Sequence, residues 1–355
     1  MANVWWNQVP NALKYTNDIK NSLLDGKSVL IISKQRFPWQ DDWKELLEEA
    51  IRQETGEKKF VDAPPVNEPG KYLLEEGCKK ETRALYRPLK GYADFLAEND
   101  DITLHDWYLR VEVDSDIQLK KWIEFVSEYV NKRKKKNRLA VFLLKWCGDY
   151  IPELMKGITV FNFDDYIEEF DKIVFSFLLS SDLKGNDFIK TYLAELAVNV
   201  AGNDVELCAE CVREGDEFLA SPENCISRIA QETCRSDGSA YDAEGLLADI
   251  KNHIWSAQIK TIYPQVERYR QYFVDKYSKQ IKKGLPIATR YGEVDSPYEV
   301  ELGTLVFMAG SRQIELSEKE YNKLKKNREA RNKLSHLSVL SLDEIKELLQ
   351  SGFYC

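Results

Sequence analysis

Three polar side chains near the C-terminus, Arg331, Asn332 and His336, have the types and spacing needed for chemistry on a phosphodiester. They occur in the sequence RNKLSH, within a lysine-rich segment, and His336 is one of only three histidines in 355 residues. Histidine changes its protonation state near neutral pH and therefore suits proton transfer. Arginine stays charged and can bind phosphate through two parallel hydrogen bonds, and an amide such as Asn332 can orient the imidazole or a phosphate oxygen. We take these residues as the candidate catalytic group.

The sequence RNKLSH resembles the Arg-polar-x-x-x-His signature of HEPN domains. The resemblance covers roughly residues 246–350 and maps onto Arg331, Asn332 and His336. It implies a homodimer formed through a C-terminal helical bundle, and a metal-independent ribonuclease effector of the kind found in bacterial anti-phage and toxin systems. RNA, the implied partner, supplies its own 2′-OH nucleophile, so cleavage needs a proton-transfer group and a cation that stabilises the phosphorane charge. No cofactor and no metal are expected.

An ideal α-helix does not place Arg331 and His336 on one face. At ~100° per residue, the five-residue step separates the two side chains by about 140°. Either the helix loosens between 333 and 336, or the site is assembled from two chains, which the HEPN resemblance also implies. A structural alternative is that Arg331 and Asn332 tie the helix end to the turn at 338–344 and that His336 caps the helix. The chain would then be a non-catalytic interaction or dimerisation protein.

The tripeptide Gly26-Lys27-Ser28 invites comparison with phosphate-binding loops, but it lies on the wrong side of a strand. The P-loop mechanism needs a glycine-rich loop after a strand, whereas this tripeptide leads into the apolar run 28–33. The turn after that run, SKQRFPWQDD, contains no glycine, and Pro38 lacks an amide donor. The layout resembles an AAA+ or STAND-type P-loop module without its signature residues. We therefore expect a degenerate scaffold that hydrolyses no nucleotide and that a protein partner could bind.

Two further clusters have structural explanations that we favour over functional ones. Cys208-x-x-Cys211 with Cys225 and Cys234 could bind zinc tetrahedrally. The irregular gaps and the helical pattern around these cysteines favour buried free thiols instead. The run NKRKKKNR at 131–138 carries six basic residues and could meet phosphates. It falls at a predicted helix end, where cations interact favourably with the helix dipole.

Two hydrophobic periodicities divide the chain into an α/β half and a helical half. In the first half, short β-rich runs alternate with amphipathic segments, a pattern typical of a mainly parallel sheet covered by helices on both faces. Strands are predicted at 28–33, 107–113, 139–144, 158–163 and 172–179, helices at 10–24, 41–54, 81–98, 116–131 and 164–171, and a loop at 56–71.

The C-terminal hundred residues have apolar residues at helical spacing and are predicted to form an all-α bundle of four or five helices. Ser341, followed by Glu344, forms the capping box of the last short helix. The other helices are predicted at 246–283, 298–309 and 317–335, with a connector at 283–298.

These patterns predict three segments: a degenerate P-loop-like α/β domain at 1–185, a helical lid or linker at 186–245 and a HEPN-like bundle at 246–355. The composition, 43% hydrophobic and 31% charged, is typical of a soluble globular protein. No apolar run reaches the length of a membrane span, and the first residues lack a secretory pattern, so a cytoplasmic location is expected. The net charge of −9 argues against general binding to duplex DNA but leaves local basic sites open.

Overall fold

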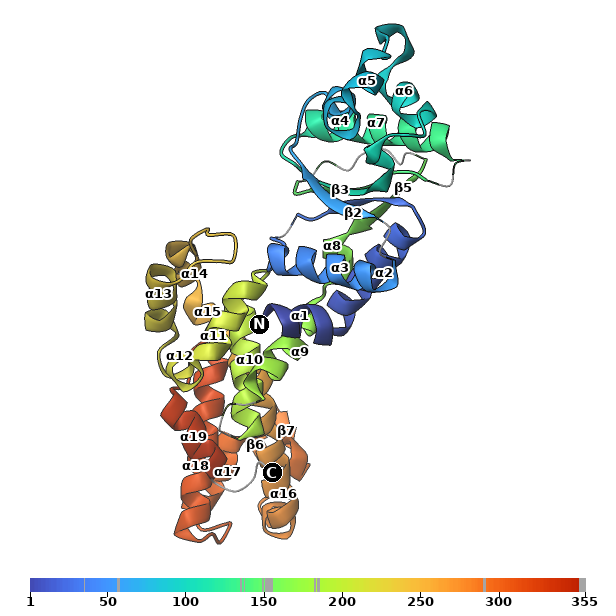
Figure 1. The fold of residues 1–355 in the computed structure, drawn as a ribbon. Coiled ribbons are helices and arrows are strands. Elements are labelled where there is room, and N and C mark those ends of the chain that lie inside the picture. The colour runs from blue at the N-terminus through green and yellow to red at the C-terminus, as the bar shows by residue number, and fades with distance from the viewer. Residues whose placement is uncertain are drawn as a thin grey trace. The chain divides into compact units, whose positions relative to one another are not determined.

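The structure, a computed structural model, describes residues 1–34, 36–55, 58–134, 136, 138–148, 150, 156–181, 183, 186–289 and 292–350. The chain divides into two compact units, residues 1–175 and 176–355, which we call unit 1 and unit 2. Unit 1 has an α/β fold and unit 2 is mainly helical (Figure 1). The predicted fold class is confirmed. The finer domain divisions at 185 and 245 stay predictions.

Unit 1 is built on a five-stranded sheet in which all neighbouring strands are parallel. The strand order is β2-β3-β4-β1-β5. Strands β1 and β4 are buried along their whole length, as their near-continuous apolar sequences predict. The strands are β1 Ser28–Ile32, β2 Lys59–Ala63, β3 Trp107–Val113, β4 Val141–Trp146 and β5 Ile158–Asn162.

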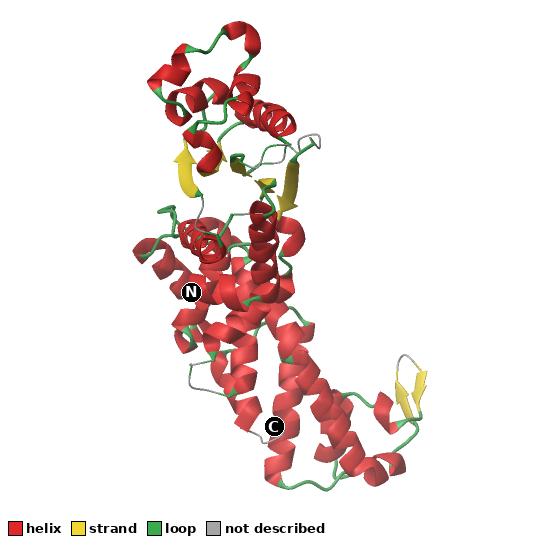
Figure 2. Cartoon of the chain, turned by 45° about the vertical axis from the view of Figure 1, so that its right-hand side comes forward, coloured by secondary structure: helices red, strands yellow, loops and turns green. Residues whose placement is uncertain are grey.

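Helices cover both faces of this sheet (Figure 2). On one face, α2 packs against β1 and α3, with α1 beside them; on the other, α7 packs against β3 and β5, with α4 and α6 beside it. The helices of unit 1 are α1 Ala2–Gln8, α2 Pro10–Leu24, α3 Gln40–Glu54, α4 Pro69–Gly77, α5 Lys80–Ala84, α6 Tyr92–Glu98, α7 Asp116–Arg133 and α8 Phe163–Tyr166, with 3-10 turns η1 Pro88–Lys90 and η2 Thr103–Asp106. Helix α9, Glu169–Ser180, begins in unit 1 and ends in unit 2.

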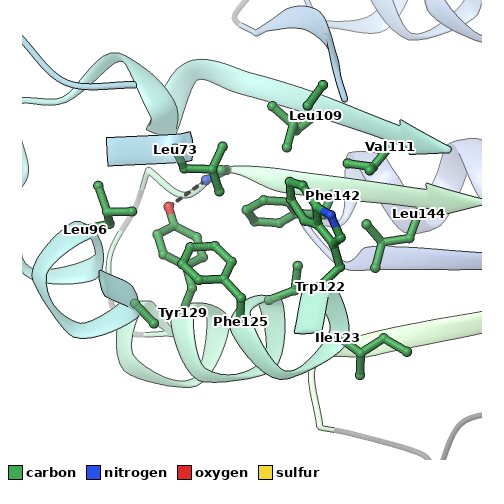
Figure 3. Packing of buried hydrophobic residues seen from close by; sticks show 14 of the residues in the cluster. Leu73, Leu96, Leu109, Val111, Trp122, Ile123, Phe125, Tyr129, Phe142 and Leu144 are labelled. Carbon is green, nitrogen blue, oxygen red and sulfur yellow. Dashed lines mark hydrogen bonds between the residues drawn. The ribbon is translucent and has the colours of Figure 1, made fainter. Parts of the chain in front are cut away.

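Aromatic side chains dominate the core between α7 and the sheet (Figure 3). Phe125 and Tyr129 of α7 pack edge-to-face against Phe142 of β4, and Trp122 lies in the same cluster. Burying apolar side chains of this size contributes about 1.5–3 kcal/mol each. The Tyr129 hydroxyl accepts a hydrogen bond from the Ala140 amide at 3.0 Å, so its polar atom is satisfied inside the core.

The prediction of a strand at 172–179 is wrong, because this segment lies inside helix α9. Buried residues recur there at Asp171, Phe175 and Ser180, close to the spacing of one helical face. The Asp171 carboxylate accepts the Glu168 amide at 2.9 Å and the Asn11 side chain at 3.0 Å, which holds the first turn of the helix. A short continuous apolar run does not by itself distinguish a strand from a buried helix.

The edge strand β2 lies within the segment 56–71 that was predicted to be a loop, and helix α4 begins at Pro69, so that prediction is wrong for residues 59–63 and 69–71. Arg110 of β3 donates to the Asp62 carboxylate at 2.7 and 3.0 Å. Phe60 stacks on Tyr108, with 4.9 Å between the ring centroids. These contacts across the strand pair stabilise an edge whose own sequence carries little strand signal.

Two predicted helices are interrupted. The segment 81–98 divides into α5, η1 and α6, because Pro88 has no amide donor and Gly91 adopts a positive φ of 64°. The segment 246–283 divides into α14, α15 and α16, and Pro264 in the first turn of α16 removes an amide that a continuous helix would use.

Unit 2 combines long helices with one small β-hairpin, the yellow pair of strands at the lower right of Figure 2. The hairpin lies within the predicted connector at 283–298. The elements are α10 Asp187–Ala201, α11 Val205–Glu214, α12 Asp216–Ala220, α13 Pro222–Glu232, α14 Ala243–Ala248, α15 Ile250–Thr261, α16 Tyr263–Lys283, β6 Ile287–Thr289, β7 Gly292–Val294, η3 Pro297–Glu299, α17 Leu302–Gly310, α18 Glu318–Ser335 and α19 Leu342–Gln350.

Candidate functional site

The candidate catalytic residues lie at the C-terminal end of helix α18. The helix begins with a capping box formed by Ser317 and Glu320, and it runs without interruption to the residue before His336. Arg331 is half-buried, whereas Asn332 and His336 are exposed. The sequence pattern therefore placed these residues correctly, late in a helix and followed by a short one.

His336 is the residue at which α18 ends. Its φ of −109° and ψ of 27° leave the helical range, and its amide donates to the carbonyls of Asn332 and Lys333 at 3.1 Å. Leu337 follows in the left-handed conformation with φ 58°, and the Ser338 amide returns to the Lys333 carbonyl at 2.9 Å. This pattern is a Schellman motif, with leucine at the position where glycine is usual. The turn fixes the backbone that carries the imidazole.

Two residues of α15 hold this helix end in place. Trp255 Nε1 donates to the Leu334 carbonyl at 2.8 Å. The fully buried Gln258 side chain donates to the Leu340 carbonyl and accepts the Leu340 amide, both at 2.8 Å. Neither residue was predicted from the sequence to belong to the site. The available signal was Gln258, a polar residue on the apolar face of a predicted helix.

Arg331 forms an ion pair on the side of α18 that faces the start of α17. Its Nη2 atom lies 3.2 Å from Glu301 Oε2, and its Nη1 atom donates to Asn332 Oδ1 at 3.4 Å. The predicted structural alternative placed Arg331 against the turn at 338–344. That tie is made instead by Lys333, whose Nζ atom lies 2.6 Å from Glu344 Oε1. Ser341 and Glu344 also form the predicted cap, because each amide donates to the other residue's side chain.

The unbroken helix keeps Arg331 and His336 on different faces. Because α18 stays helical up to Ser335, the five-residue step corresponds to about 140° around the axis. Of the two predicted ways to bring these side chains together, a loosened helix is not observed in this chain. Assembly from two chains stays a prediction.

The other phosphate-binding candidate lies at the amino end of the parallel sheet. Lys27 forms an exposed ion pair with Asp25 at 3.0 Å, before β1 begins. Ser28 is buried, and its hydroxyl accepts the Phe142 amide at 3.2 Å. Ligands of open parallel sheets bind at the opposite, carboxyl ends of the strands. This placement favours the structural explanation for Gly26-Lys27-Ser28, as the sequence pattern predicted.

The loop that follows β1 places the aromatic side chain of Phe37 at the carboxyl end of the parallel strands. The Phe37 ring centroid lies 5.1 Å from Trp6, 5.0 Å from Trp43 and 4.8 Å from Phe163. Lys145 of β4 is only 8% exposed, and its Nζ atom lies 4.8 Å from the centre of the Phe37 ring. Burial lowers the pKa of Lys145. An apolar ring thus occupies the region where a phosphate-binding loop would present backbone amides.

The four cysteines considered for zinc have different environments. Cys208, Cys211 and Cys225 are buried, and Cys234 is exposed. The Cys208 thiol lies 3.1 Å from the Ser176 hydroxyl, and burial raises the pKa of Cys211. Among the residues that the structure describes, no group of three or more His, Cys, Asp or Glu side chains could hold a metal ion.

The basic run at 131–138 is partly structural. Arg133 is 2% exposed and donates to the Ala97 carbonyl at 2.7 Å and to Asp100 at 3.1 Å. Lys136 also pairs with Asp100, at 2.9 Å. Lys135 and Asn137 lie outside the described residues. These contacts favour the structural explanation for the run.

No protein-family model and no curated protein matches this chain. The described helices include none that is both long enough and apolar enough to cross a membrane.

Proposed function

We propose that the chain is a metal-independent endoribonuclease of the HEPN type. The observation that carries the proposal is the placement of His336 as an exposed side chain on a rigid helix end. Asn332 lies one turn before it, and Arg331 lies next to Asn332. Gln258 and Trp255 support this backbone from α15, which is the kind of preorganisation that a reactive side chain requires.

Each residue of the group has a role in the proposed reaction. His336 removes the proton from a ribose 2′-OH, and the 2′-oxygen attacks the adjacent phosphorus. The bond from phosphorus to the 5′-oxygen breaks, and that oxygen takes a proton from solvent. The products are a 2′,3′-cyclic phosphate and a 5′-hydroxyl. Arg331 stabilises the charge on the phosphorane, and Asn332 orients a phosphate oxygen.

The ion pair of Arg331 is compatible with this role. Its side chain is 29% exposed and that of Glu301 is 68% exposed. Exposed pairs of this kind contribute only about 0–1 kcal/mol, so a phosphate can replace the carboxylate. Because Arg331 and His336 face different sides of α18, we propose that a homodimer through unit 2 combines Arg331 of one chain with His336 of the other.

Cleavage of single-stranded RNA in the presence of a chelator tests the proposal. We expect His336→Ala and Arg331→Ala each to lower the rate by about 10²-fold or more. His253→Ala, at a half-buried histidine of α15, is the matched control and should retain activity. Cleavage that survives both substitutions, or that requires magnesium, would contradict the mechanism.

A second candidate is a non-catalytic interaction protein, and exposed aromatic side chains in unit 2 favour it. Phe307 of α17 is 69% exposed, and Tyr298 of η3 is 57% exposed. Solvent-facing aromatic residues are typical anchors of protein interfaces. A folded dimer that cleaves no RNA, and that dissociates on Phe307→Ser, would support this candidate.

For unit 1 we propose a degenerate P-loop scaffold that binds a protein partner. The support is the layout on which the resemblance rests, a parallel sheet with its strand β1 near residue 30, followed along the chain by a helical segment. Phe37, in place of glycines after β1, favours loss of nucleotide hydrolysis. A cytoplasmic location is part of the same proposal.

A further inference from the structure

We propose that a pocket between α18 and α19 is a subsite for a backbone phosphate of the RNA substrate, several nucleotides from the cleaved bond. The inference rests on the proposed ribonuclease function, because it takes RNA as the ligand. The pocket has a volume of about 340 Å³. It is lined by Lys319, Asn322, Lys323 and Lys326 of α18 and by Glu347 and Gln350 of α19.

The lining is predominantly cationic. The three lysines share one face of α18, because they follow one another at steps of four and three residues. Glu347 is the one carboxylate among the described lining residues, and it pairs with Lys326 at 2.8 Å. That pair is exposed, with side chains 48% and 55% accessible, so it contributes little and can exchange for another anion.

The charges around Lys323 are mixed, with cations in excess. Burial lowers the pKa of Lys323, the charges of Lys276 and Lys319 lower it further, and Glu320, which pairs with Lys276 at 2.6 Å, raises it. The Lys323 Nζ atom also lies 5.1 Å from the centre of the Tyr269 ring, which limits its access to water. A bound phosphate would relieve this repulsion, and the amides of Asn322 and Gln350 can donate to its oxygens.

The pocket and the candidate catalytic histidine belong to one rigid element. At 1.5 Å per residue, His336 lies about 15 Å along the helix axis from Lys326 and about 25 Å from Lys319. A single strand that reaches both must therefore extend over several nucleotides. Contacts to phosphates position a nucleic acid without reading its bases. The subsite therefore favours single-stranded RNA that is long enough to reach from the pocket to His336.

The test measures RNA binding by the full chain carrying His336→Ala, so that a fluorescent single-stranded oligonucleotide is not cut. The slope of log Kd against log salt concentration changes by about 0.7 for each phosphate contact with a single strand. We expect the combined change Lys319→Gln, Lys323→Gln and Lys326→Gln to reduce the slope by about 0.7, because the pocket holds one phosphate. The matched control is Lys325→Gln, which removes a charge from the same helix outside the pocket lining and should leave the slope unchanged.

A slope that falls no further in the triple variant than in the Lys325→Gln control overturns the subsite. So does a chain that binds no RNA. If the triple variant unfolds, as a melting curve would reveal, the exposed Lys319→Gln alone should lower the slope by a part of that 0.7 and by more than the Lys325→Gln control does. Failure of the ribonuclease proposal looks different: the native chain would then bind RNA through these lysines and leave it intact.

Discussion

Gln258 binds both backbone groups of Leu340 with one side chain, donating to the carbonyl and accepting from the amide at 2.8 Å each. The two residues are 82 positions apart in the sequence. Gln258 is fully buried and also donates to the Tyr192 hydroxyl at 3.0 Å. This single side chain connects α10, α15 and the turn after His336.

Replacing Gln258 by alanine should destabilise unit 2. The buried amide and carbonyl of Leu340 would lose their partner, and each unsatisfied group costs about 1–3 kcal/mol. We expect the free energy of unfolding, measured by urea denaturation, to fall by about 3 kcal/mol. Gln265→Ala on α16 is the control and should change it by less than about 0.5 kcal/mol. Equal effects of the two changes would show that the Leu340 contact is unimportant.

Replacing Leu337 by glycine should stabilise the chain. Leu337 has a φ of 58° and is 73% exposed, so the substitution relieves backbone strain and removes little buried surface. Left-handed backbone costs a non-glycine residue about 1 kcal/mol, which a melting curve can detect as a higher Tm. Leu85, which is 65% exposed with a φ of −82°, is the matched control. There, glycine should lower the Tm, and a rise at both positions would refute the strain argument.

Unit 1 should lose stability as the pH falls from about 6.5 to 4, because His105 is buried in its neutral form. Its ring nitrogens bond to the Tyr129 hydroxyl and the Asn99 carbonyl at 2.7 Å, and burial lowers its pKa to about 4. In this window the unfolded chain binds the proton that the folded chain excludes. The contribution of neutral His105 to the free energy of unfolding is therefore fully present above about pH 6.5. It falls by roughly 3 kcal/mol as the pH drops through 4.

Denaturation curves of unit 1 across this pH range, with His105→Gln as the comparison, measure that loss. The variant should be less stable at neutral pH and should show a flatter dependence between pH 6.5 and 4. An unchanged slope in the variant would assign the acid sensitivity to other groups.

Replacing Glu301 by glutamine should increase RNA cleavage. The change removes the carboxylate that pairs with Arg331 at 3.2 Å and leaves the guanidinium available to a phosphate. We expect kcat/KM to rise by a few-fold, in line with about 0–1 kcal/mol for an exposed pair. Glu329→Gln, which removes a carboxylate from α18, the helix that carries Arg331, is the control for net charge. A fall in kcat/KM with Glu301→Gln would mean that the pair supports the active arrangement.

Unit 1 should not hydrolyse nucleotides. Phe37 occupies the sheet edge after β1, where hydrolysing P-loop proteins present backbone amides to phosphates. An assay for phosphate release from ATP with magnesium should give no turnover. Robust ATP turnover that is lost on Lys27→Ala or Lys34→Ala would contradict this prediction.

The sequence by itself determined the elements with strong local signals. Continuous apolar runs predicted the central strands β1 and β4, and the Ser341–Glu344 box predicted the start of α19. The helical pattern around RNKLSH predicted that this segment lies late in a helix and is followed by a short one. Caps, prolines and hydrophobic period act over a few residues, so they are readable from the chain alone.

Tertiary structure decided what depended on distant partners. The run at 172–179 became helical, and residues 59–63 became a strand because Arg110 and Tyr108 of β3 pair with them. The supports of the candidate site, Gln258, Trp255 and Glu301, lie 30 to 82 positions from the groups they contact. Such contacts form only when packing brings separate helices within hydrogen-bonding distance, and no local pattern specifies which residue will meet which.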